Sequence, residues 1–220
     1  MGDGDGGRNY GSMERRNYVP IAQSPPKAPP RTKTSSQSGH RALRFRNQPG
    51  ENAVKIAVRI DPPMGSPPEV AYRWDPDTEI LSAQLSEISG GDGMSGSVGL
   101  EGSDGSWVIL DVADGRINGV EVAVWPDVQK SAGFRMPAKI EDAHVVLPAP
   151  ASQASIASLE STTRLTAEAD SAQRNFHFKV GSGRGARTLR LGRDLLLDVD
   201  DKSHISGLWL LNVPQGPTQL

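Results

Sequence analysis

The chain has 220 residues, no cysteine and a formal net charge of −2. The absence of cysteine excludes disulfides, thiolate catalysis and cysteine-based zinc sites, and it favours a cytoplasmic setting. The chain is 36% hydrophobic and only 5% aromatic, with 24 Gly and 17 Pro. This composition is typical of short strands with many turns, and no apolar run is long enough to cross a membrane.

Residues 1–50 are predicted to form an extended, Pro-rich arm without a core. This segment holds nine Arg or Lys residues and three acidic residues, so its net charge is about +6 and that of the remainder about −8. Two interpretations stay open: a solvated tail, or a docking arm that orders on an anionic partner. In the second, the contacts come from these apolar and basic side chains: Tyr10, Tyr18, Val19, Ile21, Arg41, Arg44 and Arg46.

The first part of the body is predicted to consist of strands. Residues 54–60, VKIAVRI, alternate strictly and indicate a half-buried strand. Residues 70–74 and 80–85 are expected strands around an Asp-Pro-Asp turn. Residues 90–105 are so rich in glycine that we expect a flexible loop there, with at most a short strand near 98–100.

A hairpin follows and occurs twice in the chain. Residues 107–126, WVILDVADGRINGVEVAVWP, recur as residues 195–214, LLLDVDDKSHISGLWLLNVP. Asp114-Gly115 between apolar runs predicts a tight primed turn, because glycine readily takes positive φ. Aligning Asp111 with Asp198 indicates an internal duplication. Upstream, the alignment is weaker: Glu69, Arg73 and residues 82–84 match Glu160, Arg164 and residues 171–173.

The remaining segments complete the second copy. Residues 127–139 are expected to be irregular and residues 143–147 to form a strand. Residues 148–158 are a linker or one helical turn, and strands are expected at 176–180 and 188–191. The predicted fold class is therefore mainly β, with two related small antiparallel β domains behind the extended basic arm. The predicted organisation is: arm 1–50, first β domain 51–128, connecting segment 129–160, second β domain 161–214 and tail 215–220.

The order of motifs resembles a small uncharacterised bacterial β-domain family. Its members run roughly Tyr-Asp-x-x-x-Asp-x-Leu-Tyr-Ile-x-Leu, then Val-x-Leu-Asp-x-Asp-x-x-Gly-x-Leu-Val-Gly-Ile-Glu-Ile-Leu. Residues 72–85 and 108–122 follow that order, whereas the second copy lacks the Tyr-Asp opening. The hairpin also resembles a PRC-barrel, the β domain of the photosynthetic reaction-centre H subunit and of some ribosome-maturation factors. Both resemblances cover about half of the chain and imply a docking module.

No motif predicts a catalytic residue, a cofactor or a metal. The spacing Gly91-x-Gly93-x-x-Gly96 matches a dinucleotide fingerprint, but the sequence after it cannot form the required helix. Asp198, Asp200, Asp201 and His204 lack the glycine and the closing glutamate of a calcium loop. The histidines are scattered, and strand alternation places His177 on a polar, solvated face. A small enzyme or a ligand-binding β protein stays open as an alternative, with a site built from these residues: Asp111, Asp198, His177 or His204.

Two surfaces are candidates for binding partners. Arg184, Arg187 and Arg190, with Arg193, form a basic cluster that is either plain surface or a contact for lipid headgroups, an acidic protein or nucleic acid. Interleaved aromatic residues are missing, which disfavours nucleic acid. In the last strand, Trp209 and Leu211 replace Glu121 and Ala123 of the first copy. These two side chains either pack on the first copy or anchor a partner.

The sequence as a whole favours a non-enzymatic peripheral subunit, structural or adaptor, that docks on a larger assembly. The expected partners are other protein subunits, with an anionic membrane surface as a second candidate; nucleic acid is disfavoured, and no small-molecule substrate is identified. The expected location is cytoplasmic, at the inner face of a membrane. A basic arm and the resemblance to the H subunit favour a membrane complex such as a photosynthetic reaction centre.

Overall fold

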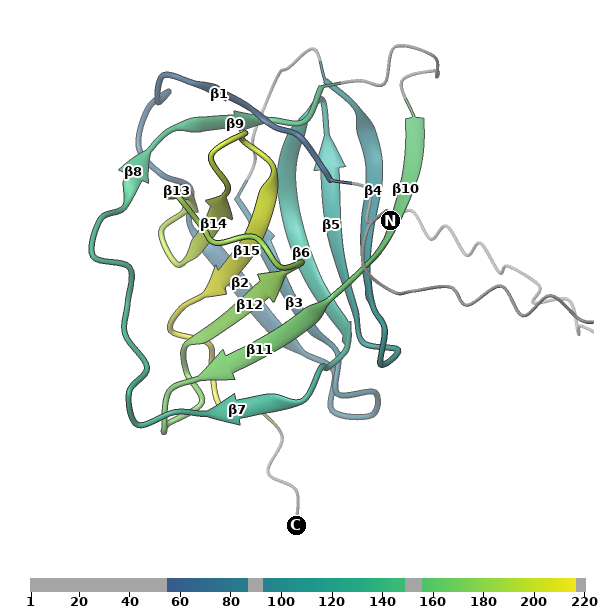
Figure 1. The fold of residues 1–220 in the computed structure, drawn as a ribbon, viewed down its shortest axis with the longest axis vertical. Coiled ribbons are helices and arrows are strands. Elements are labelled where there is room, and N and C mark those ends of the chain that lie inside the picture. Colours follow the sequence, from purple (N-terminus) through teal and green to yellow (C-terminus); the bar gives the residue numbers. More distant parts are fainter. Residues whose placement is uncertain (1–54, 87–92, 149–155, 217–220) are drawn as a thin grey trace, which may run out of the picture. The chain divides into compact units, whose positions relative to one another are not determined.

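The computed structural model describes residues 55–86, 93–148 and 156–216. Regular structure in these ranges consists of β-strands, most of them antiparallel (Figure 1), which confirms the predicted fold class. Within the same ranges there is no helix of the length and apolarity needed to cross a membrane. The predicted arm lies outside the described residues, together with its proposed contacts: Tyr10, Tyr18, Val19, Ile21, Arg41, Arg44 and Arg46.

Two large sheets form the body. The first has six strands in the order β10-β4-β5-β6-β3-β2. Their bounds are β2 Val70–Trp74, β3 Leu81–Leu85, β4 Ser95–Gly102, β5 Trp107–Ala113, β6 Arg116–Val124 and β10 Ile156–Thr163. The second has seven strands in the order β7-β11-β12-β15-β14-β13-β8. Their bounds are β7 Val128–Lys130, β8 Glu141–Asp142, β11 Leu165–Ala169, β12 Phe176–Val180, β13 Arg187–Gly192, β14 Leu195–Val199 and β15 Ile205–Leu210.

The two sheets repeat one topology, which confirms the duplication. Strands β2 to β6 lie in the order β2-β3-β6-β5-β4, and strands β11 to β15 lie in the equivalent order β11-β12-β15-β14-β13. The registers agree too, because Asp111 pairs with Gly119 and Asp198 pairs with Gly207. In the first turn, Asp114 and Gly115 have φ of 50° and 81°, as the predicted primed turn requires.

The upstream alignment made from the sequence is wrong. Ser82 pairs with Glu121, and its structural equivalent His177 pairs with Trp209 in the other sheet. Residues 171–173, which the sequence matched to residues 82–84, lie in the turn between β11 and β12. Few identities survive in this half, so strand pairing rather than residue type identifies the equivalent positions.

The leading segment of each copy lies on the hairpin turn of the other copy. The Val58 amide donates to the Ser203 carbonyl at 2.9 Å, and the Leu147 amide donates to the Gly115 carbonyl at 2.7 Å. Between these contacts, β1 (Arg59–Asp61) pairs antiparallel with β9 (His144–Val146). The copies are therefore related by an approximate two-fold exchange, in which Val58 corresponds to Leu147.

Several segments differ from their predicted structure. Half of the glycine-rich segment expected to be a loop is the eight-residue strand β4, whose Val98 and Leu100 are fully buried. Glycine serves close packing here, because a Cβ on Gly93 would lie 2.2 Å from the Gly115 Cα. Residues 156–163 form β10 rather than a helical turn, since they pair in parallel with the edge of β4. Strands β7 and β11 were not predicted.

A single hydrophobic core joins the inner faces of both sheets. Trp125 is half-buried and packs against this core, with ring centroids 5.6 Å from Trp74 and 5.7 Å from Phe178. The Tyr72 hydroxyl donates to the Asp194 carbonyl at 2.8 Å, a further link from β2 to the second copy. Burial, the largest cause, raises the pKa of Tyr72 well above its ordinary value.

We expect Phe178→Ala to lower the free energy of unfolding by about 3–5 kcal/mol, because it opens a cavity between the two sheets. Trp107→Ala is the matched control, since that aromatic side chain is 40% exposed, and it should cost less than about 1 kcal/mol. Urea denaturation of both variants measures the difference. Equal losses would contradict the shared core.

Candidate functional site

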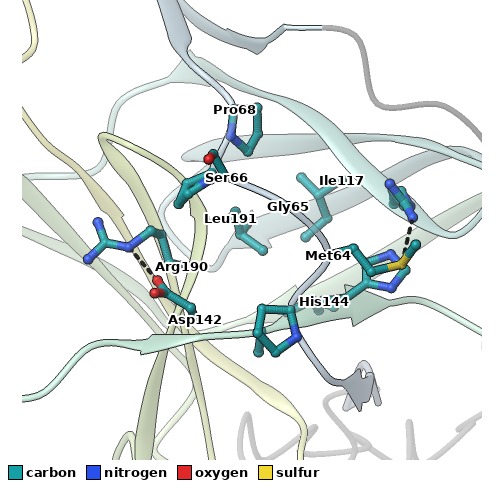
Figure 2. A pocket seen from close by; sticks show the side chains of 14 residues that line it. Met64, Gly65, Ser66, Pro68, Ile117, Asp142, His144, Arg190 and Leu191 are labelled. Carbon is teal, nitrogen blue, oxygen red and sulfur yellow. Dashed lines mark hydrogen bonds and ion pairs between the residues drawn. The ribbon is translucent and has the colours of Figure 1, made fainter.

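A hollow near the crossing of the two copies is a pocket of about 450 Å³. We call it the Arg116–His144 pocket. Its walls come from the proline-rich loop at residues 63–68, the start of β6, strand β9 and the end of β13. Figure 2 shows Arg190 and Asp142 on one side of it and Met64 and His144 on the other.

Arg116 enters this pocket because it directly follows the tight turn of the first hairpin. Its Nη2 donates to the Met64 sulfur at 3.7 Å, and its buried Nε has no hydrogen-bond partner. A thioether is a weak acceptor, and the Met64 side chain that supplies it is 71% exposed. Among the described residues no carboxylate forms an ion pair with Arg116. The half-buried guanidinium is thus a cation whose side-chain acceptor in the described residues is a soft sulfur.

His144 faces the pocket from β9, where it pairs with Asp61 of β1. Its Nε2 is buried and has no hydrogen-bond partner. Burial and, next, the positive charge of Arg116 lower the pKa of His144, against a smaller opposite effect of Asp61. The imidazole is therefore neutral at pH 7, and it can donate or accept one hydrogen bond at Nε2.

The predicted basic cluster is only partly free. Arg187 forms a 2.8 Å ion pair with Glu141, and Arg190 forms one with Asp142, so strand β8 neutralises both. Arg193 pairs with Glu69 at 2.8 Å. Arg184 lies in the exposed loop before β13. Three arginines of the cluster are thus paired with acidic residues that come from distant segments of the chain.

The predicted apolar anchors are covered by the chain itself. Trp209 and Leu211 are 7% and 6% exposed, and they cluster with Leu196 on the outer face of the second sheet. Phe134 and Ile140 of the connecting segment pack against this cluster. Neither predicted alternative describes this arrangement, since the cover is the connecting segment rather than the first copy or a partner. Trp209 and Leu211 are therefore not accessible surface.

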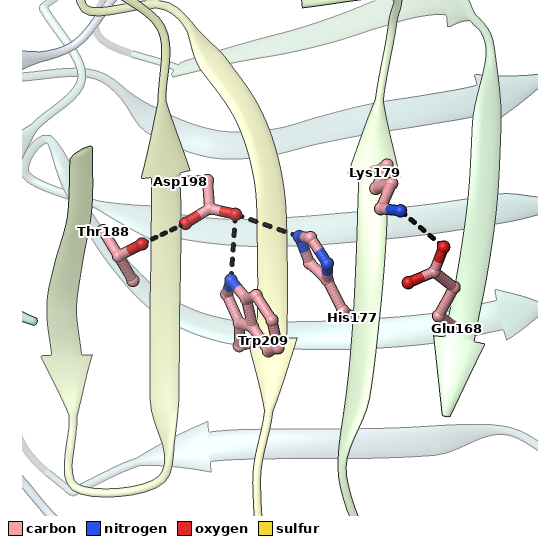
Figure 3. Close-up of polar contacts among 6 residues, drawn as sticks. All are labelled: Glu168, His177, Lys179, Thr188, Asp198 and Trp209. Carbon is pink, nitrogen blue, oxygen red and sulfur yellow. Dashed lines mark hydrogen bonds and ion pairs between the residues drawn. The ribbon is translucent and has the colours of Figure 1, made fainter. Parts of the chain in front are cut away.

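Beside them lies a buried polar network centred on Asp198 (Figure 3). Its carboxylate accepts hydrogen bonds from Thr188 Oγ1 at 2.6 Å and from Trp209 Nε1 at 2.9 Å, and it lies 2.9 Å from His177 Nε2. The His177 ring stacks on Trp209 with centroids 3.7 Å apart. Burial alone would raise the pKa of Asp198, but these hydrogen bonds outweigh it and lower the pKa.

The solvated position expected for His177 is wrong, because its side chain is only 14% exposed. His177 and Asp198 do come together, but neither lines the Arg116–His144 pocket or two other pockets of the described structure. Asp111 is exposed on the other sheet, and His204 pairs with Asp200 at 3.2 Å. The four residues considered for a catalytic site thus do not converge. In the described ranges no group of three or more His, Asp or Glu gathers to hold a metal.

Sequence reasoning missed Arg116 and His144. His144 was one scattered histidine, and Arg116 lay unremarked beside the Asp-Gly turn. A signal was available in the comparison of the two hairpins, because position 113 is alanine where the second copy has Asp200. That difference removes a carboxylate from the neighbourhood of Arg116.

Comparison with known proteins adds no family to this description. A scan against protein-family models finds no match, and a search of curated proteins finds no significant match either.

We expect Asp198→Ala to lower the free energy of unfolding by about 3–5 kcal/mol, because it strands the buried partners of that carboxylate. Asp111→Ala alters the equivalent but exposed position of the first copy, and it should change stability by no more than about 0.5 kcal/mol. Urea denaturation at pH 7 compares the two. A similar small effect at both positions would show that the network does not stabilise the fold.

Proposed function

We propose that this protein is a non-enzymatic adaptor that docks on a larger assembly through the Arg116–His144 pocket. One observation carries the proposal: Arg116 Nε and His144 Nε2 are both buried at this pocket without a hydrogen-bond partner. Buried polar atoms are nearly always satisfied, and leaving one unpaired costs about 1–3 kcal/mol. A polar group of a partner would satisfy both atoms.

The chemistry of the lining supports binding rather than transformation. The wall contributes a guanidinium without a carboxylate partner among the described residues, one neutral imidazole and a proline-rich loop that includes the Ser66 hydroxyl. The carboxylate of Asp142 is already engaged by Arg190 at 2.8 Å. These groups can orient and hold a ligand, whereas nucleophilic catalysis needs a nucleophile and a base within hydrogen-bonding distance of each other.

The volume of the pocket favours a second candidate function. At about 450 Å³ it falls in the range of pockets that hold small molecules, about 300–1,000 Å³. The protein would then be a ligand-binding β protein. Nucleic acid is less favoured, because Arg187 and Arg190 are neutralised by Glu141 and Asp142 and offer little charge to phosphates.

The identity of the assembly is a prediction from sequence alone. Docking of this subunit at the cytoplasmic face of a membrane complex, such as a photosynthetic reaction centre, rests on the resemblance of the hairpin and on the basic composition of residues 1–50. Other protein subunits are the proposed partners, and an anionic membrane surface is the second.

Site-specific photo-crosslinking tests the docking proposal. A photoreactive amino acid replaces Ser66, which is exposed on the pocket rim, in the full-length chain. We expect one discrete adduct in extracts of the source cells, and mass spectrometry identifies it. The control carries the same group at Asp77, exposed in the turn between β2 and β3, and should give no adduct. Equal labelling at both positions, or none at Ser66, would overturn docking through this pocket.

A further inference from the structure

The duplication gives the Arg116–His144 pocket an equivalent in the second copy. The first is lined by Arg116, Ile117, His144 and Leu191, and the second by the matching His204, Ile205, Lys55 and Leu100. Lys55 and His144 are equivalent, because Lys55 lies three residues before Val58 and His144 lies three residues before its counterpart Leu147. The equivalent pocket is smaller, about 170 Å³. It serves as an internal reference for the first.

The two pockets differ in the side-chain acceptor of the first residue after the hairpin turn, which is Arg116 in the first copy and His204 in the second. In the second copy, Asp200 Oδ2 lies 3.2 Å from His204 Nδ1, and the Asp200 backbone amide bonds the His204 carbonyl at 2.8 Å. In the first copy the same strand pair is Ala113 with Arg116. The chain thus supplies an internal carboxylate at one pocket, but alanine stands at the equivalent position of the other.

In the first copy, Met64 contacts Arg116 where the second copy has the Asp200 carboxylate beside His204. Within the described ranges the Met64 sulfur is the only side-chain acceptor for Arg116, at 3.7 Å, and thioether sulfur accepts hydrogen bonds weakly. The exposed side chain of Met64 is flexible and has room to move aside. An arginine fork binds oxygens of carboxylate or phosphate through two parallel N–H groups. Arg116 has this fork with its Nε unused.

We propose that the Arg116–His144 pocket binds an oxyanion, a carboxylate or a phosphate group, between the Arg116 guanidinium and His144 Nε2. The ligand stands in for the carboxylate that Asp200 supplies in the second copy. This inference deepens the proposed function by naming the chemical group that the partner or small molecule presents.

The charges around His144 set the pH dependence of binding. Arg116 and Arg59 disfavour its protonation and Asp61 favours it, while Arg59 is itself paired with Asp61 at 3.1 Å. Across the pocket, Arg190 and Asp142 neutralise each other. A bound oxyanion adds negative charge beside the imidazole and stabilises the protonated form. Binding therefore takes up a proton, and affinity rises as pH falls through the range in which His144 titrates.

Histidine-ring NMR of the full-length protein tests this inference. Ring signals are followed from pH 5 to pH 8 in chloride buffer, then with inorganic phosphate or acetate at the same ionic strength, and His144→Gln assigns the signal. We expect phosphate or acetate to raise the pKa of His144 and to leave that of His204 unchanged. Arg116→Gln should weaken binding of the oxyanion by about tenfold or more, because a hydrogen bond to a charged group is lost.

The sharpest variant is Ala113→Asp, which restores the carboxylate that the second copy has at Asp200. It should abolish the response to both anions, whereas the neutral Ala113→Asn should keep it. Lys55→Ala in the equivalent pocket should also leave it unchanged. A response to phosphate alone or to acetate alone identifies the source of the group, and either supports the proposal. No anion response in the unaltered chain, or one that persists in both Arg116→Gln and Ala113→Asp, overturns it.

Together, the crosslinking and NMR experiments distinguish oxyanion binding from docking on a partner. A Ser66 adduct without any anion response means that the partner docks through other chemistry. An anion response without an adduct means that the pocket takes a small oxyanion, as in a ligand-binding protein. The oxyanion proposal stands in the second case and fails in the first.

Discussion

The shared core between the two sheets is the constraint on which the rest of the structure depends. A single copy of this size buries too little apolar surface to be stable alone, and its inner face needs a second sheet. Leu110 in the first sheet and Phe178 in the second are both fully buried in one cluster. The exchanged backbone contacts at Val58 and Leu147 then lock the copies together at the hairpin turns. The pocket exists because the copies cross at these turns.

The duplicated fold has equivalent positions in its two copies, and the residues at these positions differ. On the outer face of the second sheet, Trp209 replaces Glu121 and is covered by Phe134. At the turns, Asp200 Oδ2 lies 3.2 Å from His204 Nδ1, whereas Ala113 offers Arg116 no carboxylate. In the second copy Asp200 and His204 thus bond each other, whereas in the first copy Arg116 has only the Met64 sulfur as a side-chain acceptor in the described residues.

The local pattern of the sequence predicted much of the fold. Strands β2 and β12 have the predicted bounds, and the Asp114-Gly115 turn has the predicted positive φ. The sequence failed where the partner strand decides the structure. Glycine-rich β4 and the Ala-containing β11 have weak strand propensity, and pairing with neighbours overrides it. The candidate site was missed because Arg116 and His144 are 28 positions apart and no local pattern joins them.

The sequence by itself determined the β class, the duplicated hairpin and the residues that could carry charge. These depend on alternation, turn chemistry and composition, which act over a few residues. Only the tertiary structure decided which charges are paired. It brought Glu141 to Arg187 and Asp142 to Arg190, covered Trp209 with the connecting segment, and left Arg116 with the Met64 sulfur. Pairing and burial are properties of distance in space, and segments far apart in the chain set that distance.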